Sequence, residues 1–219
     1  MSHHGFIPSS AEDALRRRVK AEIRKRMRGL RNTMPPSACA QRSARIVERL
    51  ESMAEISTAA TVALFWPIEE KHEVDLRAID QAIRARGGRV AYPSIDPETR
   101  EMTFRIVSDV ATLEERGLGF REPPEAAPEV PSGELSTIVV PALAIDPTGH
   151  RIGYGAGFYD RTLARYANEA TTLGVAFDYQ LISEVPVTSG DTPVAWIVTD
   201  GRTLRAEPRA PDPLLNPVS

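Results

Sequence analysis

The segment "GHRIGYGAGFYDR", residues 149–161, contains the residue types that bind phosphate. Its three alternating glycines have no Cβ, so backbone N–H groups at these positions can close on an anion. Arg151 precedes the glycines, and a guanidinium can donate two parallel hydrogen bonds to phosphate oxygens. Asp160 follows them, and a carboxylate beside phosphates favours a Mg²⁺ ion that both can bind. The segment therefore predicts a phosphate site with a metal at its end.

A second acid, Asp191, could complete this metal site. It stands in a turn just before an apolar run, where a carboxylate can reach a cleft. Both features have simpler alternatives. The glycines could form an ordinary turn whose aromatic neighbours only pack, since their spacing departs from the GxGxxG dinucleotide fingerprint. Asp191 alone could be an ordinary turn aspartate.

Residues 16–31 form a strongly basic segment, with nine Lys or Arg residues against one acid, Glu22. The segment carries +8 in a chain of net charge −3, which indicates an anionic partner such as phosphate, a polyanionic cofactor or nucleic acid. Lys20, Arg24 and Arg31 are four and seven residues apart and therefore share one helical face. We expect the helix to bury a neighbouring apolar stripe and to present these cations at its seam, with a solvated basic face as the alternative. The stripe consists of Leu15, Val19, Ile23, Met27 and Leu30.

Hydrophobic periodicity places the remaining elements along the chain. It predicts helices over residues 14–30, 37–53 and 73–88, with another starting near Tyr159. Apolar runs predict strands over residues 61–67, 89–94, 102–108, 136–146, 171–177 and 194–199. The proline-rich residues 121–133 are predicted to be a surface loop. Strands that alternate with helices predict a three-layer α/β fold, in which helices flank a mostly parallel sheet.

Composition indicates a single folded unit in a reducing compartment. The chain has 219 residues, of which 42% are hydrophobic, and we expect one α/β domain over residues 14–204. A mobile start, residues 1–13, and a proline-rich tail, residues 205–219, would flank it. The start lacks the apolar core of a secretory signal, and no run approaches the roughly 20 apolar residues that cross a bilayer. One cysteine, Cys39, cannot form an internal disulfide, so we expect a cytoplasmic protein without a membrane partner.

Together these segments resemble the 5-formyltetrahydrofolate cyclo-ligase family, also called methenyltetrahydrofolate synthetases. The glycine segment is very close to the family's G-x-R-[LI]-G-x-G-x-G-[YF]-Y-D-R motif, which is long and specific. Three weaker matches occur in the family's order. "KAEIR" followed by Arg31 resembles its N-terminal basic helix, "FWPIEEKHEVD" its folate-binding segment, and "GVAFDYQLISEVPVTSGD" a later block that ends in Asp. The resemblance extends over about residues 19–200.

The resemblance implies the fold of ribose-phosphate isomerases and CoA transferases, and an ATP- and Mg²⁺-dependent ligase. Its substrate would be 5-formyltetrahydrofolate, a reduced folate, and its products 5,10-methenyltetrahydrofolate, ADP and phosphate. ATP would phosphorylate the formyl oxygen, N10 would attack the activated carbon, and phosphate would leave as the ring closes. Such chemistry requires positioning and charge neutralisation more than a protein nucleophile. We expect a monomer or weak homodimer with no nucleic-acid partner.

The family's functional positions carry over to this chain residue by residue. The resemblance implies catalytic roles for Arg151 and Tyr159, and Mg²⁺ ligands at Asp160 and Asp191. ATP would contact Lys20, Arg24, Arg151, Ile152, Gly153, Tyr154, Gly155, Ala156, Gly157, Phe158 and Tyr159. The reduced folate would contact Trp66, Glu73, Tyr154, Gly155, Ala156, Gly157 and Phe158.

The chain departs from the family pattern at several positions. The segment between Pro67 and Glu73 is slightly longer than usual, which weakens the assignment of the folate-binding residues there. Leu76 stands where the family commonly has Thr, Ala156 where many members have Gly or Lys, and Phe158 where Tyr is commoner. None of these departures removes a charge that the reaction requires.

Two other functions remain open on the sequence alone. A relative on the same scaffold could act on a sugar phosphate without ATP, and a turnover assay with and without ATP separates the two. The basic segment 16–31 could instead bind DNA or RNA. That alternative predicts binding that weakens steeply with salt and survives the substitution Asp160→Ala.

Overall fold

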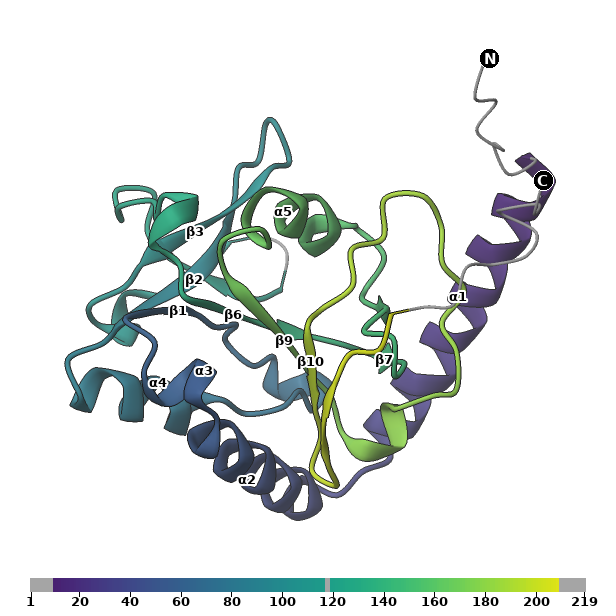
Figure 1. Cartoon of the computed structure of the whole chain (residues 1–219), viewed down its shortest axis with the longest axis horizontal. Coiled ribbons are helices and arrows are strands. Elements are labelled where there is room, and N and C mark those ends of the chain that lie inside the picture. The colour runs from purple at the N-terminus through teal and green to yellow at the C-terminus, as the bar shows by residue number, and fades with distance from the viewer. Residues whose placement is uncertain (1–9, 117–118, 209–219) are drawn as a thin grey trace.

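A seven-stranded sheet forms the centre of the protein (Figure 1). The computed structural model describes residues 10–116 and 119–208. The strands of this sheet are β1 (Thr61–Ala63), β2 (Arg89–Ile95), β3 (Met102–Ile106), β6 (Thr137–Pro141), β9 (Thr171–Val175), β10 (Trp196–Val198) and β11 (Thr203–Arg205). Their order is β11-β10-β9-β6-β1-β2-β3. The five inner strands are parallel, and β11 and β3 pair antiparallel at the two edges.

Helices and two short ribbons complete the described part of the chain. The helices are α1 (Ser10–Asn32), α2 (Pro36–Ser52), α3 (Ala54–Ser57), α4 (Arg77–Ala85) and α5 (Phe158–Tyr166). The ribbons pair β4 (Glu114–Glu115) with β5 (Arg121–Glu122), and β7 (Ala144–Ile145) with β8 (Arg151–Ile152). Four single turns of 3-10 helix lie at Glu69–Lys71, Val110–Thr112, Ser132–Glu134 and Asp178–Gln180.

The strands bury both of their faces. Along β6, Val139 packs in the cluster that contains α2 and α4 residues, whereas Ile138 and Val140 pack with residues of α5. This alternation follows from the period of two along a strand, and a parallel sheet is stable when helices cover both of its faces. Figure 1 shows α2, α3 and α4 on one face and α5 on the other. The predicted three-layer, mostly parallel α/β fold is confirmed.

The strand order changes direction between β1 and β6. From β1 the chain adds β2 on one side, and from β6 it adds β9 and β10 on the other side. At such a switch point, the connections leave the carboxyl ends of neighbouring strands toward opposite faces, which opens a crevice. The predicted strand over 136–146 is divided here: β6 ends at Pro141, and the chain then forms the β7–β8 ribbon that carries the glycine segment.

α1 docks on the body with a polar face, so the predicted burial of the whole apolar stripe is wrong. Of the stripe only Met27 is fully buried, and Lys20 and Arg31 are buried in the same row along the helix. The exposed members of the stripe are Leu15 (61%), Val19 (40%) and Leu30 (45%). The reason is the surface beneath α1, which presents carbonyls and acids of site loops; the Arg16 and Arg24 side chains, for example, donate to the carbonyls of Val187 and Gly153.

The proline-rich residues 121–133 cover a sheet edge, so their prediction as a surface loop is only partly correct. The Ile106 N–H donates to the Pro128 carbonyl (2.9 Å), and the Val130 N–H donates to the Phe104 carbonyl (2.8 Å). Val130 is buried in the core. The segment therefore continues the hydrogen bonding of β3 beyond the sheet, although its prolines prevent a regular strand.

The ends of the described ranges extend the predicted domain slightly. α1 begins at Ser10, so residues 10–13 are helical, and β11 includes Arg205. The Ala206 N–H then donates to the Ala195 carbonyl (2.8 Å). The rest of the predicted start and tail, residues 1–9 and 209–219, lies outside the described residues. Within the described ranges, every helix is too short or too polar to cross a membrane.

Candidate functional site

A cavity of about 550 Å³ opens at the switch point of the sheet. Trp66 follows β1, Ile95 ends β2 and Pro141 ends β6, and all three line it. Parallel strands present ligand sites at their carboxyl ends, which is where this cavity lies. α1 and the loop that contains Asp191 also line the cavity.

All fifteen residues that the sequence nominated line this one cavity. They come from α1, from the segment after β1, from the glycine segment and from the loop before β10, which are far apart in sequence. The apolar wall of the same cavity could not be predicted from the sequence, because its members look like ordinary core residues. The wall consists of Phe65, Pro93, Ile95, Met102, Phe120 and Pro141.

The glycine segment adopts the open backbone that its composition predicts. Gly155 and Gly157 have φ of 109° and 70°, values that side-chain-bearing residues rarely adopt. α5 begins directly after them at Phe158, so the positive end of its dipole faces the cavity. The Arg24 Nε donates to the Gly153 carbonyl (2.9 Å), which fixes the segment to α1. The segment therefore has the geometry of an anion site at a helix N-terminus.

Two ion pairs flank the glycine segment. Lys20 Nζ lies 2.5 Å from Asp191 Oδ2, and Arg151 Nη2 lies 3.0 Å from Asp160 Oδ1. Arg151 is almost fully buried, and this loss of solvent lowers its pKa below the usual arginine value, while Asp160 acts in the opposite direction. Arginine nevertheless stays protonated in proteins, so the cavity holds a fixed positive charge at this point.

Asp160 and Asp191 have the donor chemistry that a Mg²⁺ ion requires. Asp160 accepts through Oδ1 and Asp191 through Oδ2, and the second oxygen of each carboxylate accepts no hydrogen bond within the described ranges. Thr192 joins them, since it follows Asp191 in the chain and its N–H approaches Asp160 Oδ1 at 3.4 Å. The described residues contain no cluster of three or more His, Cys, Asp or Glu. Mg²⁺ commonly binds one or two carboxylates together with phosphate oxygens and water, so the residues fit this ion.

Glu73 stands at the other end of the glycine segment with both oxygens occupied. Its Oε2 accepts from the Ile68 N–H (3.0 Å), and its Oε1 accepts from the Tyr154 hydroxyl (2.5 Å). Arg31 Nη2 donates to the same hydroxyl (2.5 Å). Sequence reasoning placed Arg31 on the same helical face as Lys20 but gave it no ligand role.

The two tyrosines of the segment are neutral at physiological pH. Burial raises the pKa of Tyr154 far above its usual value, and the Glu73 carboxylate raises it further. Burial also raises the pKa of Tyr159, with Glu73 again the second cause. Neither phenol can serve as a base near pH 7, whereas both hydroxyls can donate hydrogen bonds.

Comparisons with known proteins agree with the geometry. The model of the 5-formyltetrahydrofolate cyclo-ligase family matches residues 16–200. The chain is 28% identical over 179 residues to a 5-formyltetrahydrofolate cyclo-ligase of Escherichia coli, an alignment that covers 80% of this chain and 97% of the relative. It is 42% identical over 96 residues to a 5-formyltetrahydrofolate cyclo-ligase of Mycolicibacterium smegmatis, over 43% of this chain and 50% of that one.

Solved structures show the same fold. The structure of a 5,10-methenyltetrahydrofolate synthetase from Aquifex aeolicus superposes with a TM-score of 0.75 at 28% identity, and covers 89% of this chain and 96% of that one. A second, from Mycoplasma pneumoniae, superposes with a TM-score of 0.67 at 19% identity, over 83% of this chain and 98% of that one. At that lower identity the likeness concerns the fold alone.

Proposed function

Because this chain belongs to the 5-formyltetrahydrofolate cyclo-ligase family, we propose that it converts 5-formyltetrahydrofolate to 5,10-methenyltetrahydrofolate and consumes ATP with Mg²⁺. One observation carries the proposal beyond the family name. A single cavity is lined both by the cations Lys20, Arg24 and Arg151, which suit phosphates, and by Trp66 and Glu73, which suit the reduced folate. The glycine segment lines the same cavity. ATP and the reduced folate can therefore bind next to each other in this cavity, on either side of the glycine segment.

The proposed chemistry activates an oxygen that otherwise leaves poorly. The formyl oxygen on N5 takes the γ-phosphoryl group of ATP, and ADP is released. N10 then forms a bond to the formyl carbon and loses its proton, and the carbon–oxygen bond breaks as the oxygen departs within phosphate. Phosphoryl transfer depends on alignment and charge neutralisation, which the cations of this cavity provide.

We assign the roles of the chain's own residues within that scheme. Lys20 and Arg24 hold the phosphates from the side of α1, and Arg151 neutralises charge on the group in transfer. Tyr159, as a neutral phenol, donates a hydrogen bond inside the cavity. Asp160 and Asp191 hold Mg²⁺, which neutralises phosphate oxygens when it is bound.

The glycine segment and its neighbours divide between the two ligands. The nucleotide contacts the backbone of the segment from Ile152 through Phe158 as well as the cations of α1. The reduced folate contacts Trp66, Glu73 and the side of the same segment that carries Tyr154 and Phe158. The fact that all of these residues line one cavity supports this division.

The direct test is an absorbance assay for the methenyl product. We expect product only when 5-formyltetrahydrofolate, ATP and Mg²⁺ are all present, and we expect Asp160→Ala to reduce kcat by about 10²–10³-fold. Glu48→Ala removes an exposed acid on α2, far from the cavity, and serves as the control that keeps full activity. Turnover without ATP would refute the proposed reaction. Full activity of the Asp160→Ala variant would refute the metal role alone.

A further inference from the structure

The hairpin between β2 and β3 holds an arginine in an unusual backbone conformation. Arg100 has φ of 59°, in the left-handed region that glycine and asparagine favour. Asp96 fixes the turn: its carboxylate accepts from the N–H groups of Glu98 and Thr99, and its carbonyl accepts from the Arg100 N–H (2.9 Å). A glycine at this position would relieve the strain of this backbone conformation. The backbone therefore does not explain why an arginine occupies this position, and its side chain must supply the reason.

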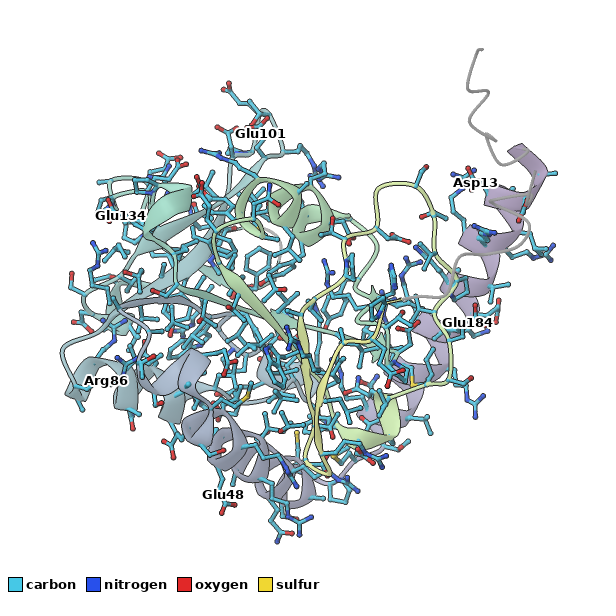
Figure 2. The ribbon with its side chains drawn as sticks, in the orientation of Figure 1. Asp13, Glu48, Arg86, Glu101, Glu134 and Glu184 are labelled. Carbon is cyan, nitrogen blue, oxygen red and sulfur yellow. The ribbon has the colours of Figure 1, made fainter. Side chains whose placement is uncertain are left out.

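The Arg100 side chain lines the cavity and has no charged partner among the described residues. Its guanidinium carbon lies 5.3 Å from the centroid of the Phe158 ring. Within residues 10–116 and 119–208 the side chain makes no hydrogen bond or ion pair. Of the acids on the same hairpin, Asp96 accepts from the Glu98 and Thr99 N–H groups, and Glu98 and Glu101 are exposed, with Glu101 near the hairpin tip (Figure 2). The guanidinium is thus free to receive an anion from the cavity.

The acids that line the cavity are engaged elsewhere. Glu73 accepts from Tyr154, Asp160 pairs with Arg151, and Asp191 pairs with Lys20. Figure 1 shows the β2–β3 hairpin beside α5, away from α1, which carries Lys20 and Arg24. Arg100 therefore reaches the cavity from a different element than the cations of α1.

The wall beside Arg100 is apolar. Pro93 and Ile95 of β2 and Met102 of β3 line the cavity near the hairpin, together with Phe158. The centroid of the Phe158 ring lies between 5.3 and 5.5 Å from the guanidinium carbons of Arg100 and Arg161, and the edge of the ring remains for a ligand ring. Such a wall suits a flat ring, and a guanidinium at its mouth suits a carboxylate attached to that ring. 5-Formyltetrahydrofolate has this layout, because an aromatic ring joins its pterin to a glutamyl tail with free carboxylates.

We propose that Arg100 is the receptor for a carboxylate of the substrate's glutamyl tail, with the adjoining aromatic ring against Phe158. This inference rests on the proposed function and adds a specificity-determining residue to it. Because Arg100 is exposed at the cavity mouth, the contact is partly screened by solvent, and its strength falls as salt rises. Substrates with longer glutamyl tails bring more carboxylates to the same mouth.

The test compares 5-formyltetrahydrofolate with 5-formyltetrahydropteroate, which lacks the glutamate. We expect Arg100→Ala to raise the KM for 5-formyltetrahydrofolate by about 5-fold at low salt, with kcat and the KM for ATP unchanged. With the pteroate substrate, the variant and the wild type should have equal KM values. Arg165→Ala is the matched control, because Arg165 also stacks at 5.3 Å on an aromatic ring, that of Tyr166, but lies outside the cavity.

A second variant separates binding from folding. Arg100→Gly relieves the left-handed strain, so we expect a higher Tm together with the same rise in KM. An equal KM rise for both substrates, an unchanged KM, or a rise in the KM for ATP would overturn the assignment. A wild-type protein without ATP-dependent turnover would instead refute the proposed function, and the two failures are therefore distinct.

Discussion

Tyr154 joins three parts of the site through one side chain. Its hydroxyl accepts from Arg31 on α1 and donates to Glu73 after β1, while its backbone belongs to the glycine segment. Its ring lies 5.0–5.6 Å from the cationic groups of Arg28, Arg31 and Lys71. Cations over an aromatic face are attracted to it, so the ring is fixed from several directions. Tyr154 thereby positions the carboxylate that we assign to the folate.

We expect Tyr154→Phe to raise the KM for 5-formyltetrahydrofolate by about 10-fold, because Glu73 loses a hydrogen bond to its charged form. Arg31→Met should also raise this KM, because Arg31 donates to the same Tyr154 hydroxyl. A double-mutant cycle on KM should therefore show a coupling of at least about 1 kcal/mol. Arg28→Met is the control, since Arg28 lies over the same ring but donates only to the Tyr154 carbonyl. Additive effects of the two substitutions would contradict this linkage.

The sequence alone was sufficient to predict the residues whose side chains or backbone suit phosphate and metal binding. The glycines, Arg151 and the two acids stand in a long motif or at a turn, and all of them line the cavity. The role of Arg31, which the sequence placed only on the cationic face of its helix, and the interest of Arg100 could not be predicted in this way. Arg31 acts through a hydroxyl that is 123 positions away in the chain, and the interest of Arg100 lies in a backbone angle.

At the scale of elements, α1 shows why periodicity alone cannot orient a helix. The apolar stripe and the row of cations lie on adjacent faces, and the sequence does not reveal which kind of surface the helix will meet. Because that surface consists of site loops, the cations turn inward and only part of the stripe is buried. Met27 packs with Leu143, Ile152 and Val185 in a small cluster of its own.

The orientation of α1 can be tested by comparing the free energy of unfolding of variants at buried and exposed positions of this helix. We expect Met27→Ala to lower the free energy of unfolding by about 2–4 kcal/mol, because it leaves a cavity in a buried cluster. Leu15→Gln should change it by less than about 0.5 kcal/mol, because Leu15 is 61% exposed. Urea denaturation of both variants provides the measurement. A loss for Leu15→Gln as large as that for Met27→Ala would show that the stripe is buried.

For the whole molecule, alternating apolar runs and helical periods were sufficient to predict the three-layer class. The strand bounds were less predictable, because β1 and β10 have only three residues each and the apolar runs continue beyond them. The break after Pro141 was also hidden, since residues 142–145 are as apolar as a strand but leave the sheet to form the β7–β8 ribbon.

Acid stability is a further property of the whole molecule. The Arg202 side chain donates to both oxygens of Asp178, and this pairing holds the pKa of Asp178 below its usual value. A carboxyl with a depressed pKa stabilises the fold above its unfolded pKa of about 3.9, and this contribution is lost as pH falls through the folded value.

We therefore expect Asp178→Asn to lower the free energy of unfolding by up to about 1 kcal/mol at pH 7, a modest value because the pair is partly exposed. The difference from wild type should shrink as the pH falls through the depressed folded pKa of Asp178, because the wild-type carboxyl then becomes protonated as well. Urea titrations at neutral and acidic pH provide the comparison. A difference that persists in acid would assign the effect to packing instead of charge.

The segment that covers β3 also affects the tendency of the protein to aggregate at high concentration. An open strand edge is a template on which another chain can add, and fibrils grow in this way. Here Pro128 and Pro131 bring no N–H, and Glu129 between them adds charge. An incoming strand thus finds few donors and a repulsive carboxylate, so this border of the sheet resists self-polymerisation.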